Sequence, residues 1–182
     1  RKMLSHYDNA TLYNDSIVAQ IVKRFQKQDA IVIYVPDHGE ECYEENRGFI
    51  CRNHSAEIDW PLAHYEFEIP FWIYCSSKYI RNHRDIYRQI RKAKDKRFMT
   101  DALPHLLLYL AGIETPTYKE EYNILSPKYD EMRPRILKNS ADYDKLRDAY
   151  LEKEAKKKAA EEAKEKKTQK MSKKKGSKKK KQ

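Results

Sequence analysis

The chain has 182 residues, enough for one folded domain and an appendage, and 40% of its residues are hydrophobic. This apolar fraction, together with 12% aromatic residues, excludes a wholly disordered protein. No run of 18 apolar residues and no secretory apolar segment is present, so the sequence predicts no transmembrane helix in this chain. Because the sequence starts at Arg1 rather than Met, we expect that a further segment of the protein precedes it.

The net charge of +10 comes from the C-terminal residues. Residues 151–182 contain 15 lysines and 5 glutamates, whereas residues 1–150 contain 23 basic and 23 acidic side chains. We therefore divide the chain into a folded domain, residues 1–150, and a Lys-rich low-complexity tail, residues 151–182. The tail is suited to contact anionic partners, and it is expected to be disordered or helical. Its last part, residues 171–182, carries too many like charges to fold alone.

The first half of the chain predicts a helix and two buried strands. Apolar residues recur at helical spacing over residues 5–28, and a short apolar run follows at residues 30–35. That run has no polar alternation, which is typical of a strand buried on both faces of a parallel sheet. After a polar stretch at residues 40–68, which is as long as an active-site insertion, residues 69–75 form a second apolar run. The order predicts an α/β fold with a mostly parallel sheet.

The second half predicts two further helices and a short strand. Residues 78–96 are strongly charged and predict a surface helix. Residues 100–112 predict a helix that begins with Thr100 as N-cap and ends at Gly112. Residues 131–137 predict a late edge strand, because the proline within them excludes a central one.

The most informative motif is Asp37-His38-Gly39-Glu40, directly after the first predicted strand. In open α/β sheets, ligands bind beyond the carboxyl ends of the strands. An adjacent Asp and His offer a carboxylate oxygen and an imidazole nitrogen, which zinc or manganese accepts. The alternative is a simple turn, in which Asp37 caps the backbone, His38 is exposed and Gly39 has a positive φ. Both interpretations stay open on these residues alone.

The polar loop after this motif contains further candidates. His54 could supply another metal ligand or donate a proton to a leaving group. Arg47 and Arg52 flank it and could hold phosphate oxygens in a bidentate way. Taken singly, each of these side chains is better explained as an exposed, solubilising loop residue.

Three cysteines, Cys42, Cys51 and Cys75, form no CxxC pair, which argues against a structural zinc knuckle. A disulfide between Cys42 and Cys51 is sterically conceivable and would fit an oxidising compartment. Free thiols are the alternative, and the sequence does not decide between the two.

Three segments together resemble the phosphoethanolamine transferases, inner-membrane enzymes of the alkaline phosphatase and sulfatase superfamily. The resemblance extends from about residue 5 to residue 138. The segments are YDNATLYND (7–15), IVIYVPDHGEE (31–41) and YEFEIPFWIYCS (65–76).

The resemblance implies an alkaline phosphatase-like α/β/α sandwich with a mixed, mostly parallel sheet, of which this chain is the C-terminal portion. It implies that Asp37 and His38 hold zinc, with manganese as a possible substitute. A carboxylate ligand and a threonine nucleophile would come from residues before Arg1, so that the fragment alone would be inactive.

The same resemblance implies transfer of phosphoethanolamine from phosphatidylethanolamine to a lipopolysaccharide or lipid A-type glycolipid. His54, which follows Glu45-Asn46, would bind the phosphoethanolamine group; apart from the resemblance, Arg52 and Glu40 are further candidates for substrate binding. The enzyme would be held in the bacterial inner membrane by helices upstream of this chain, with its catalytic domain in the periplasm and no nucleic acid as partner.

Two alternative functions remain. A sulfatase or phosphodiesterase of the same superfamily would keep the fold and change the chemistry. A catalytically inactive binding module, in which the basic tail holds nucleic acid or a membrane, would place the function outside the folded domain.

Overall fold

The computed structural model describes residues 2–44, 50–51 and 57–179, and the chain separates into two compact units. Unit 1 consists of residues Arg1–Ala56 and His64–Arg133, and unit 2 of Glu57–Ala63 and Pro134–Gln182. The elements are α1 (Lys2–Phe25), β1 (Ile31–Tyr34), β2 (Glu41–Cys42), β3 (Ile50–Cys51), α2 (Trp60–Phe67), β4 (Trp72–Cys75), α3 (Ser77–Asn82), α4 (Arg84–Ala93), η2 (Thr100–Ala102), α5 (Leu103–Leu110), η3 (Glu120–Tyr122), β5 (Ile136–Leu137), β6 (Ala141–Asp142) and α6 (Tyr143–Lys179).

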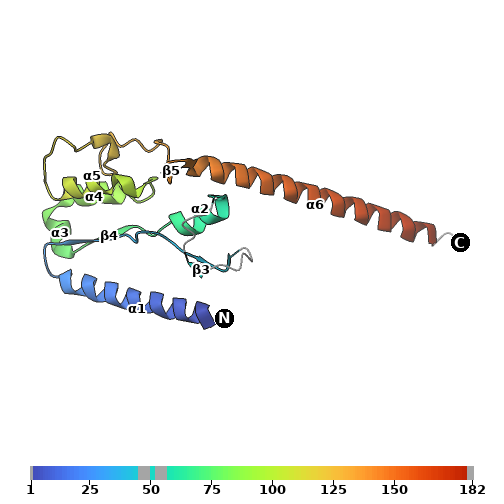
Figure 1. Cartoon of the computed structure of the whole chain (residues 1–182), viewed down its shortest axis with the longest axis horizontal. Helices are drawn as coiled ribbons and strands as arrows, with labels where there is room; N and C mark the ends of the chain where they lie inside the picture. Colours follow the sequence, from blue (N-terminus) through green and yellow to red (C-terminus); the bar gives the residue numbers. More distant parts are fainter. Residues whose placement is uncertain (1, 45–49, 52–56, 180–182) are drawn as a thin grey trace. The chain divides into compact units, whose positions relative to one another are not determined.

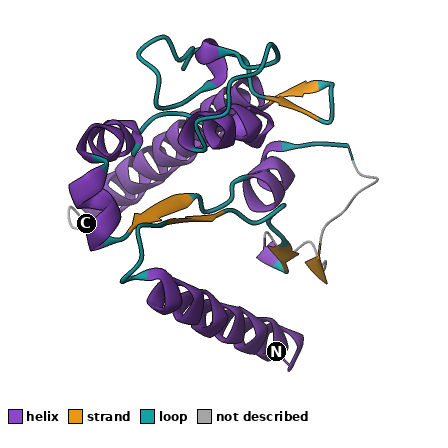
Figure 2. Cartoon of the chain, turned by 90° about the vertical axis from the view of Figure 1, so that its left-hand side faces the viewer, coloured by secondary structure: helices purple, strands orange, loops and turns teal. Residues whose placement is uncertain are grey.

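Unit 1 has three layers. Strands β1 and β4 form a two-stranded sheet, with α1 on one side and α3, α4 and α5 on the other (Figures 1 and 2). The core lies between the sheet and the helices of the second side, around Ala93, Leu106, Ile124 and Leu125. Ile73 of β4 packs against this cluster. The burial of these apolar side chains holds β4, and with it the loop that follows β1, in place.

The predicted strands exist, but their environment and direction differ from the prediction. Ile31 pairs with Cys75 and Tyr34 with Trp72, so β1 and β4 are antiparallel, and all four residues of each strand are half-buried rather than buried. An apolar run without alternation specifies a two-sided environment and not a direction. An antiparallel strand at the edge of an otherwise parallel sheet is common in α/β folds.

Two helix predictions need correction. The helix predicted over residues 78–96 is broken at His83, whose φ of −126° and ψ of 51° are not helical and whose ring lies 3.3 Å from the Asp29 carboxylate. Thr100 begins a 3₁₀ turn and caps nothing with its side chain.

The predicted end at Gly112 is confirmed. Its φ is +65°, and Gly112 and Ile113 donate to the carbonyls of Tyr109 and Leu108. These are the two hydrogen bonds of a Schellman motif.

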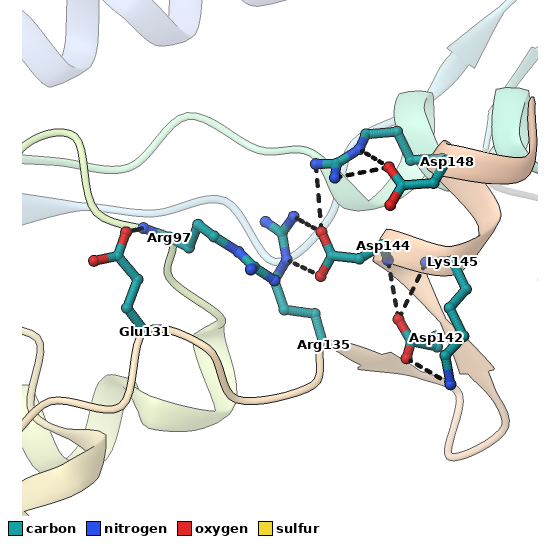
Figure 3. A network of polar contacts seen from close by, with 8 residues as sticks. Arg97, Glu131, Arg135, Asp142, Asp144, Lys145 and Asp148 are labelled. Carbon is teal, nitrogen blue, oxygen red and sulfur yellow. Dashed lines mark hydrogen bonds and ion pairs between the residues drawn. The ribbon is translucent and has the colours of Figure 1, made fainter. Parts of the chain in front are cut away.

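Unit 2 contains a short hairpin and the start of α6. The predicted edge strand is reduced to Ile136–Leu137, which pairs with β6. Asp142 Oδ1 accepts hydrogen bonds from the backbone N–H groups of Asp144 and Lys145, at 3.1 and 3.3 Å, and so caps α6. Arg135 binds both oxygens of Asp144, at 2.7 and 3.1 Å (Figure 3). The first turn of α6 is therefore fixed by a cap and a bidentate ion pair.

Helix α6 continues through the predicted boundary at 150/151 and ends at Lys179. Of the two alternatives for the tail, the structure has the helical one, including residues 171–179, which we expected not to fold alone. Because these residues continue an existing helix, they need no separate nucleation. No helix among the described residues is both long and apolar enough to span a bilayer.

Candidate functional site

The Asp37–Glu40 segment lies immediately beyond the end of β1, as the sequence predicted. The Asp37 side chain is 89% exposed and that of His38 is 24% exposed. One carboxylate oxygen of Asp37, Oδ1, accepts the backbone N–H of His38 at 3.1 Å, and the other, Oδ2, lies 3.5 Å from His38 Nε2. The two side chains therefore turn toward the same point.

The orientation of the His38 ring fixes which nitrogen carries its proton. Nδ1 lies 2.8 Å from the carbonyl oxygen of Gly39. A carbonyl only accepts, so Nδ1 carries a proton, and the ring can then present the lone pair of Nε2 to a metal ion. Metal-binding histidines are commonly oriented by such a hydrogen bond to a backbone carbonyl.

The spacing of the two donor atoms fits a tetrahedral metal ion. Zinc with ligands at about 2.0–2.2 Å places two of its ligand atoms about 3.3–3.5 Å apart. The distance from Asp37 Oδ2 to His38 Nε2 is 3.5 Å. Within the described residues there is no group of three or more His, Cys, Asp or Glu side chains that could hold a metal. Asp37 Oδ2 and His38 Nε2 are therefore a pair of candidate donor atoms.

Gly39 is required because another backbone passes close to it. A Cβ atom at this position would lie 2.2 Å from the carbonyl oxygen of Tyr65 in α2. The Gly39 N–H donates to the carbonyl of Glu66 at 2.9 Å. Gly39 does not have a positive φ, so the turn we considered as the alternative explanation of this glycine is wrong. The glycine allows close approach to α2 instead.

The two halves of the sequence signature meet in space. Tyr7, from the YDNA segment of α1, lies close enough to Cys42 of β2 for each group to affect the pKa of the other. Burial raises the pKa of the Cys42 thiol, and the carboxylates of Glu44 and Glu40 raise that pKa further. Burial likewise raises the pKa of Tyr7, together with the charges of Cys42 and Glu40. We singled out both segments from the sequence but did not predict that α1 and β2 lie close together. The two segments are far apart along the chain, and no local pattern marks which distant segments meet.

The cysteines do not pair in the way considered. The β2–β3 register places Cys42 opposite Ile50 and Cys51 opposite Glu41. Cys42 and Cys75 are free thiols. The alternative of free thiols therefore holds for these two residues.

The remaining predicted site residues divide into two groups. Glu40 is half-buried and lies near Tyr7 and Cys42, whose pKa values it raises. Arg52 and His54, the other predicted substrate-binding residues, lie outside the described residues, as does Arg47.

A profile of the sulfatase family matches residues 1–113. The chain belongs to the sulfatase family. This sulfatase-family chain is 32% identical over 148 residues to phosphoethanolamine transferase EptC from Escherichia coli O18:K1:H7 (strain RS218 / NMEC), covering 77% of the chain and 24% of that protein. It is 30% identical over 97 residues to the Kdo(2)-lipid A phosphoethanolamine 7''-transferase of Escherichia coli (strain K12), covering 52% and 16%.

The structural comparison confirms the predicted fold class. The C-terminal periplasmic domain of EcEptC from Escherichia coli matches with a TM-score of 0.60 and 30% identity, over 76% of this chain and 39% of that one. A second crystal structure of the same domain, in complex with Zn, matches equally well. This sulfatase-family chain thus has the alkaline phosphatase-like α/β fold, and it spans about a quarter of the length of the curated relatives it matches.

Proposed function

We propose that this sulfatase-family chain is the C-terminal part of the catalytic domain of a phosphoethanolamine transferase, in which Asp37 and His38 are two of the zinc ligands. The observation that carries the proposal is the geometry of the pair. Asp37 Oδ2 and His38 Nε2 lie 3.5 Å apart, and the Gly39 carbonyl holds the His38 ring in the tautomer that a metal needs. The similarity to the Zn complex of the EcEptC domain supports zinc as the ion.

In the whole protein, phosphoethanolamine would move from phosphatidylethanolamine to a lipopolysaccharide or lipid A-type glycolipid. The names of the relatives support transfer of phosphoethanolamine, and one of them supports lipid A as the acceptor. The similarity to a periplasmic domain supports an inner-membrane enzyme with its catalytic domain in the periplasm. The remaining zinc ligands and the threonine nucleophile would belong to other parts of the whole protein, since this chain spans about a quarter of the length of its relatives.

Each residue of the motif has a defined task in this mechanism. Bound zinc would neutralise charge on the phosphoryl oxygens and lower the pKa of the nucleophile. Asp37 offers Oδ2, which faces His38 Nε2, while its Oδ1 is held by the His38 N–H. Gly39 fixes the ring of His38 through its carbonyl, and its N–H fastens the segment to α2 at Glu66. The ligands are therefore oriented before any ion binds.

Three further residues are proposed to bind the substrate. The Glu40 carboxylate would attract the ammonium group of phosphoethanolamine. Arg52 would hold phosphoryl oxygens and His54 would donate a proton to the leaving group.

The test uses the full-length protein with the double substitution Asp37→Ala and His38→Ala. Zinc and manganese per protein are measured by elemental analysis, and transfer is measured with labelled phosphatidylethanolamine. A matched control is Asp29→Ala with His83→Ala, because these two residues form another Asp–His pair, at 3.3 Å, outside the motif. We expect loss of the bound metal and of transfer in the first variant only. Retention of both by the first variant would show that the site is assigned wrongly.

A sulfatase function is the second candidate, because the matching profile is that of the sulfatase family. Assaying the same protein with a sulfate ester and with phosphatidylethanolamine separates the two. Turnover of the sulfate ester alone would replace the transferase proposal while leaving the metal site intact.

A further inference from the structure

The solvent-exposed face of α3 and α4 is strongly basic. Within residues 77–95, eleven residues are exposed, of which seven are basic, two are acidic and two are polar and uncharged. We call the seven basic residues the basic face: Lys78, Arg81, Arg84, Arg88, Arg91, Lys92 and Lys94. Because the segment has no other charged side chain when its histidine is neutral, its net charge is +5.

The rest of the folded domain has the opposite net charge. Residues 1–150 contain 23 basic and 23 acidic side chains, and residues 77–95 contribute 7 of the basic and 2 of the acidic ones. The other 131 residues of the domain therefore hold 16 basic and 21 acidic side chains, a net charge of −5. An anionic surface would attract the basic face and repel the remainder, and so would orient the domain as well as bind it.

Packing on the inner side of α4 keeps the basic face turned toward solvent. Three side chains of α4 pack into the core cluster of unit 1, namely those of Ile86, Ile90 and Ala93. Gln89 accepts a hydrogen bond from the hydroxyl of Tyr109 in α5, at 2.8 Å. Arg84, Arg88 and Arg91 follow one another at spacings of four and three residues, which places them in a row about 10 Å long on one side of the helix. This row is fixed in direction by the core behind it.

The cations of the basic face are available to an external anion. Arg88 pairs with Asp85 at 2.9 Å, and Lys94 lies 3.6 Å from Asp95, but all four side chains are between 65% and 88% exposed. Ion pairs between such exposed groups contribute little, so either cation can turn to another partner. Within the described residues, the other five cations of the face form no ion pair.

We propose that the basic face of α3 and α4 binds the surface of a bilayer that contains anionic lipid. This rests on the proposed function, which places the domain at a membrane whose lipids are its substrates. The face is separate from the candidate metal site. Helix α3 follows Cys75, which pairs with Ile31 at the start of β1, whereas the Asp37–Glu40 segment follows the other end of that strand.

The chemistry of the face fits lipid phosphates. Four of its seven cations are arginines, whose guanidinium groups bind phosphate oxygens in a bidentate way. The exposed residues within 77–95 include no aromatic ring on which a base could stack, which favours lipid over nucleic acid. Each cation near an anionic surface strengthens binding about fivefold. Since the apolar side of α4 is packed in the core, the binding should be by charge rather than by insertion.

The experiment measures lysine accessibility in the intact full-length protein, reconstituted in nanodiscs. Discs of phosphatidylcholine alone are compared with discs of an equal mixture of phosphatidylcholine and phosphatidylglycerol. Acetylation by a water-soluble reagent is followed at each lysine by peptide mass spectrometry. Lys78, Lys92 and Lys94 are the reporters of the basic face. Lys23 and Lys27, which are exposed near the end of α1 on the other side of the sheet, are the control sites (Figure 1).

The test variant removes the arginine row and keeps the three reporter lysines (Arg84→Gln, Arg88→Gln and Arg91→Gln). The loss of three cations should weaken the association on the order of 100-fold, which is enough to abolish protection. The matched control variant removes the same net charge from exposed residues near the end of α1 (Lys23→Gln, Arg24→Gln and Lys27→Gln).

In the wild-type protein, we expect acetylation of the three reporters to be at least about threefold slower in the anionic discs, because lipid phosphates cover their amino groups, whereas the rates at Lys23 and Lys27 change by less than about 1.5-fold. Raising the salt concentration should remove this protection. The test variant should show no protection, and the control variant should keep it.

Equal reporter rates in the two kinds of disc would overturn the proposal, as would equal protection of Lys23 and Lys27 or protection that survives in the test variant. Stronger protection by single-stranded RNA, added to neutral discs at the same salt, would assign the face to nucleic acid instead. Zinc content and transfer are measured on the same preparations. If both are absent from the wild-type protein while the reporters are protected, the proposed function fails and the lipid-binding face stands.

Discussion

Replacement of Gly39 by alanine tests whether the loop must lie against α2 for the proposed metal site to form. The added Cβ would lie 2.2 Å from the carbonyl oxygen of Tyr65, about 1 Å inside normal contact, and the obstructing atoms are backbone. The loop must therefore retreat by about 1 Å, which costs about 1–3 kcal/mol. The hydrogen bond from Gly39 to Glu66 would weaken as well, and its loss costs about another 1 kcal/mol.

The same shift should reach the proposed zinc ligands, because the Gly39 carbonyl orients His38. Metal ligands tolerate displacements of about 0.2 Å, so we expect zinc affinity of the full-length protein to fall about 10- to 100-fold. Gly112→Ala is the control, since a Cβ there meets nothing within 4 Å and only its φ of +65° is strained. That control should cost about 1–2 kcal/mol of stability and leave zinc binding unchanged. Wild-type zinc affinity in the Gly39→Ala variant, measured by competition with a chelating dye, would refute the reasoning.

Two further predictions concern the surroundings of the site. Glu44→Gln should speed alkylation of Cys42 at pH 8 about two- to fivefold, because removing a nearby negative charge lowers the thiol pKa and raises the thiolate fraction. Peptide mass spectrometry measures alkylation at each cysteine. The rate at Cys75 should not change, because the pKa of Cys75 is raised by burial alone. Arg133→Lys should lower the free energy of unfolding by about 1 kcal/mol, because lysine cannot reproduce the bidentate contact of Arg133 with Asp101, at 2.6 and 2.7 Å. Denaturant titration measures this loss of stability. An unchanged denaturation midpoint would contradict the prediction.

The sequence predicted the position of the Asp37–His38 motif better than the contacts that hold it. The strand expected at residues 30–35 is β1, Ile31–Tyr34, and the Asp-His pair does follow it. An apolar run and the polar residues that end it are local features of the sequence, so both the strand and its end could be predicted from the sequence alone. The antiparallel pairing of β1 with β4 was not, because strand direction depends on the path of the intervening chain.

The reason for Gly39 illustrates what a single sequence leaves out. A glycine after an Asp-His pair suggested a turn with positive φ, whereas the structure shows that α2 leaves no room for a side chain. The partner in that contact, Tyr65, lies 26 positions away and offers only its carbonyl oxygen. Backbone atoms are the same in every residue, so no side-chain pattern marks such a contact.

The motif is held by contacts that need no metal. Asp37 is fixed by the His38 N–H, His38 by the Gly39 carbonyl and Gly39 by the carbonyl of Glu66. Each of these hydrogen bonds uses a backbone group, so the pair keeps its geometry as long as the loop stays on α2. Two ligands oriented in this way lose little conformational freedom when an ion arrives, which favours binding once the remaining ligands are supplied. The contact between Gly39 and α2, although it touches neither metal nor substrate, therefore sets the affinity of the proposed site.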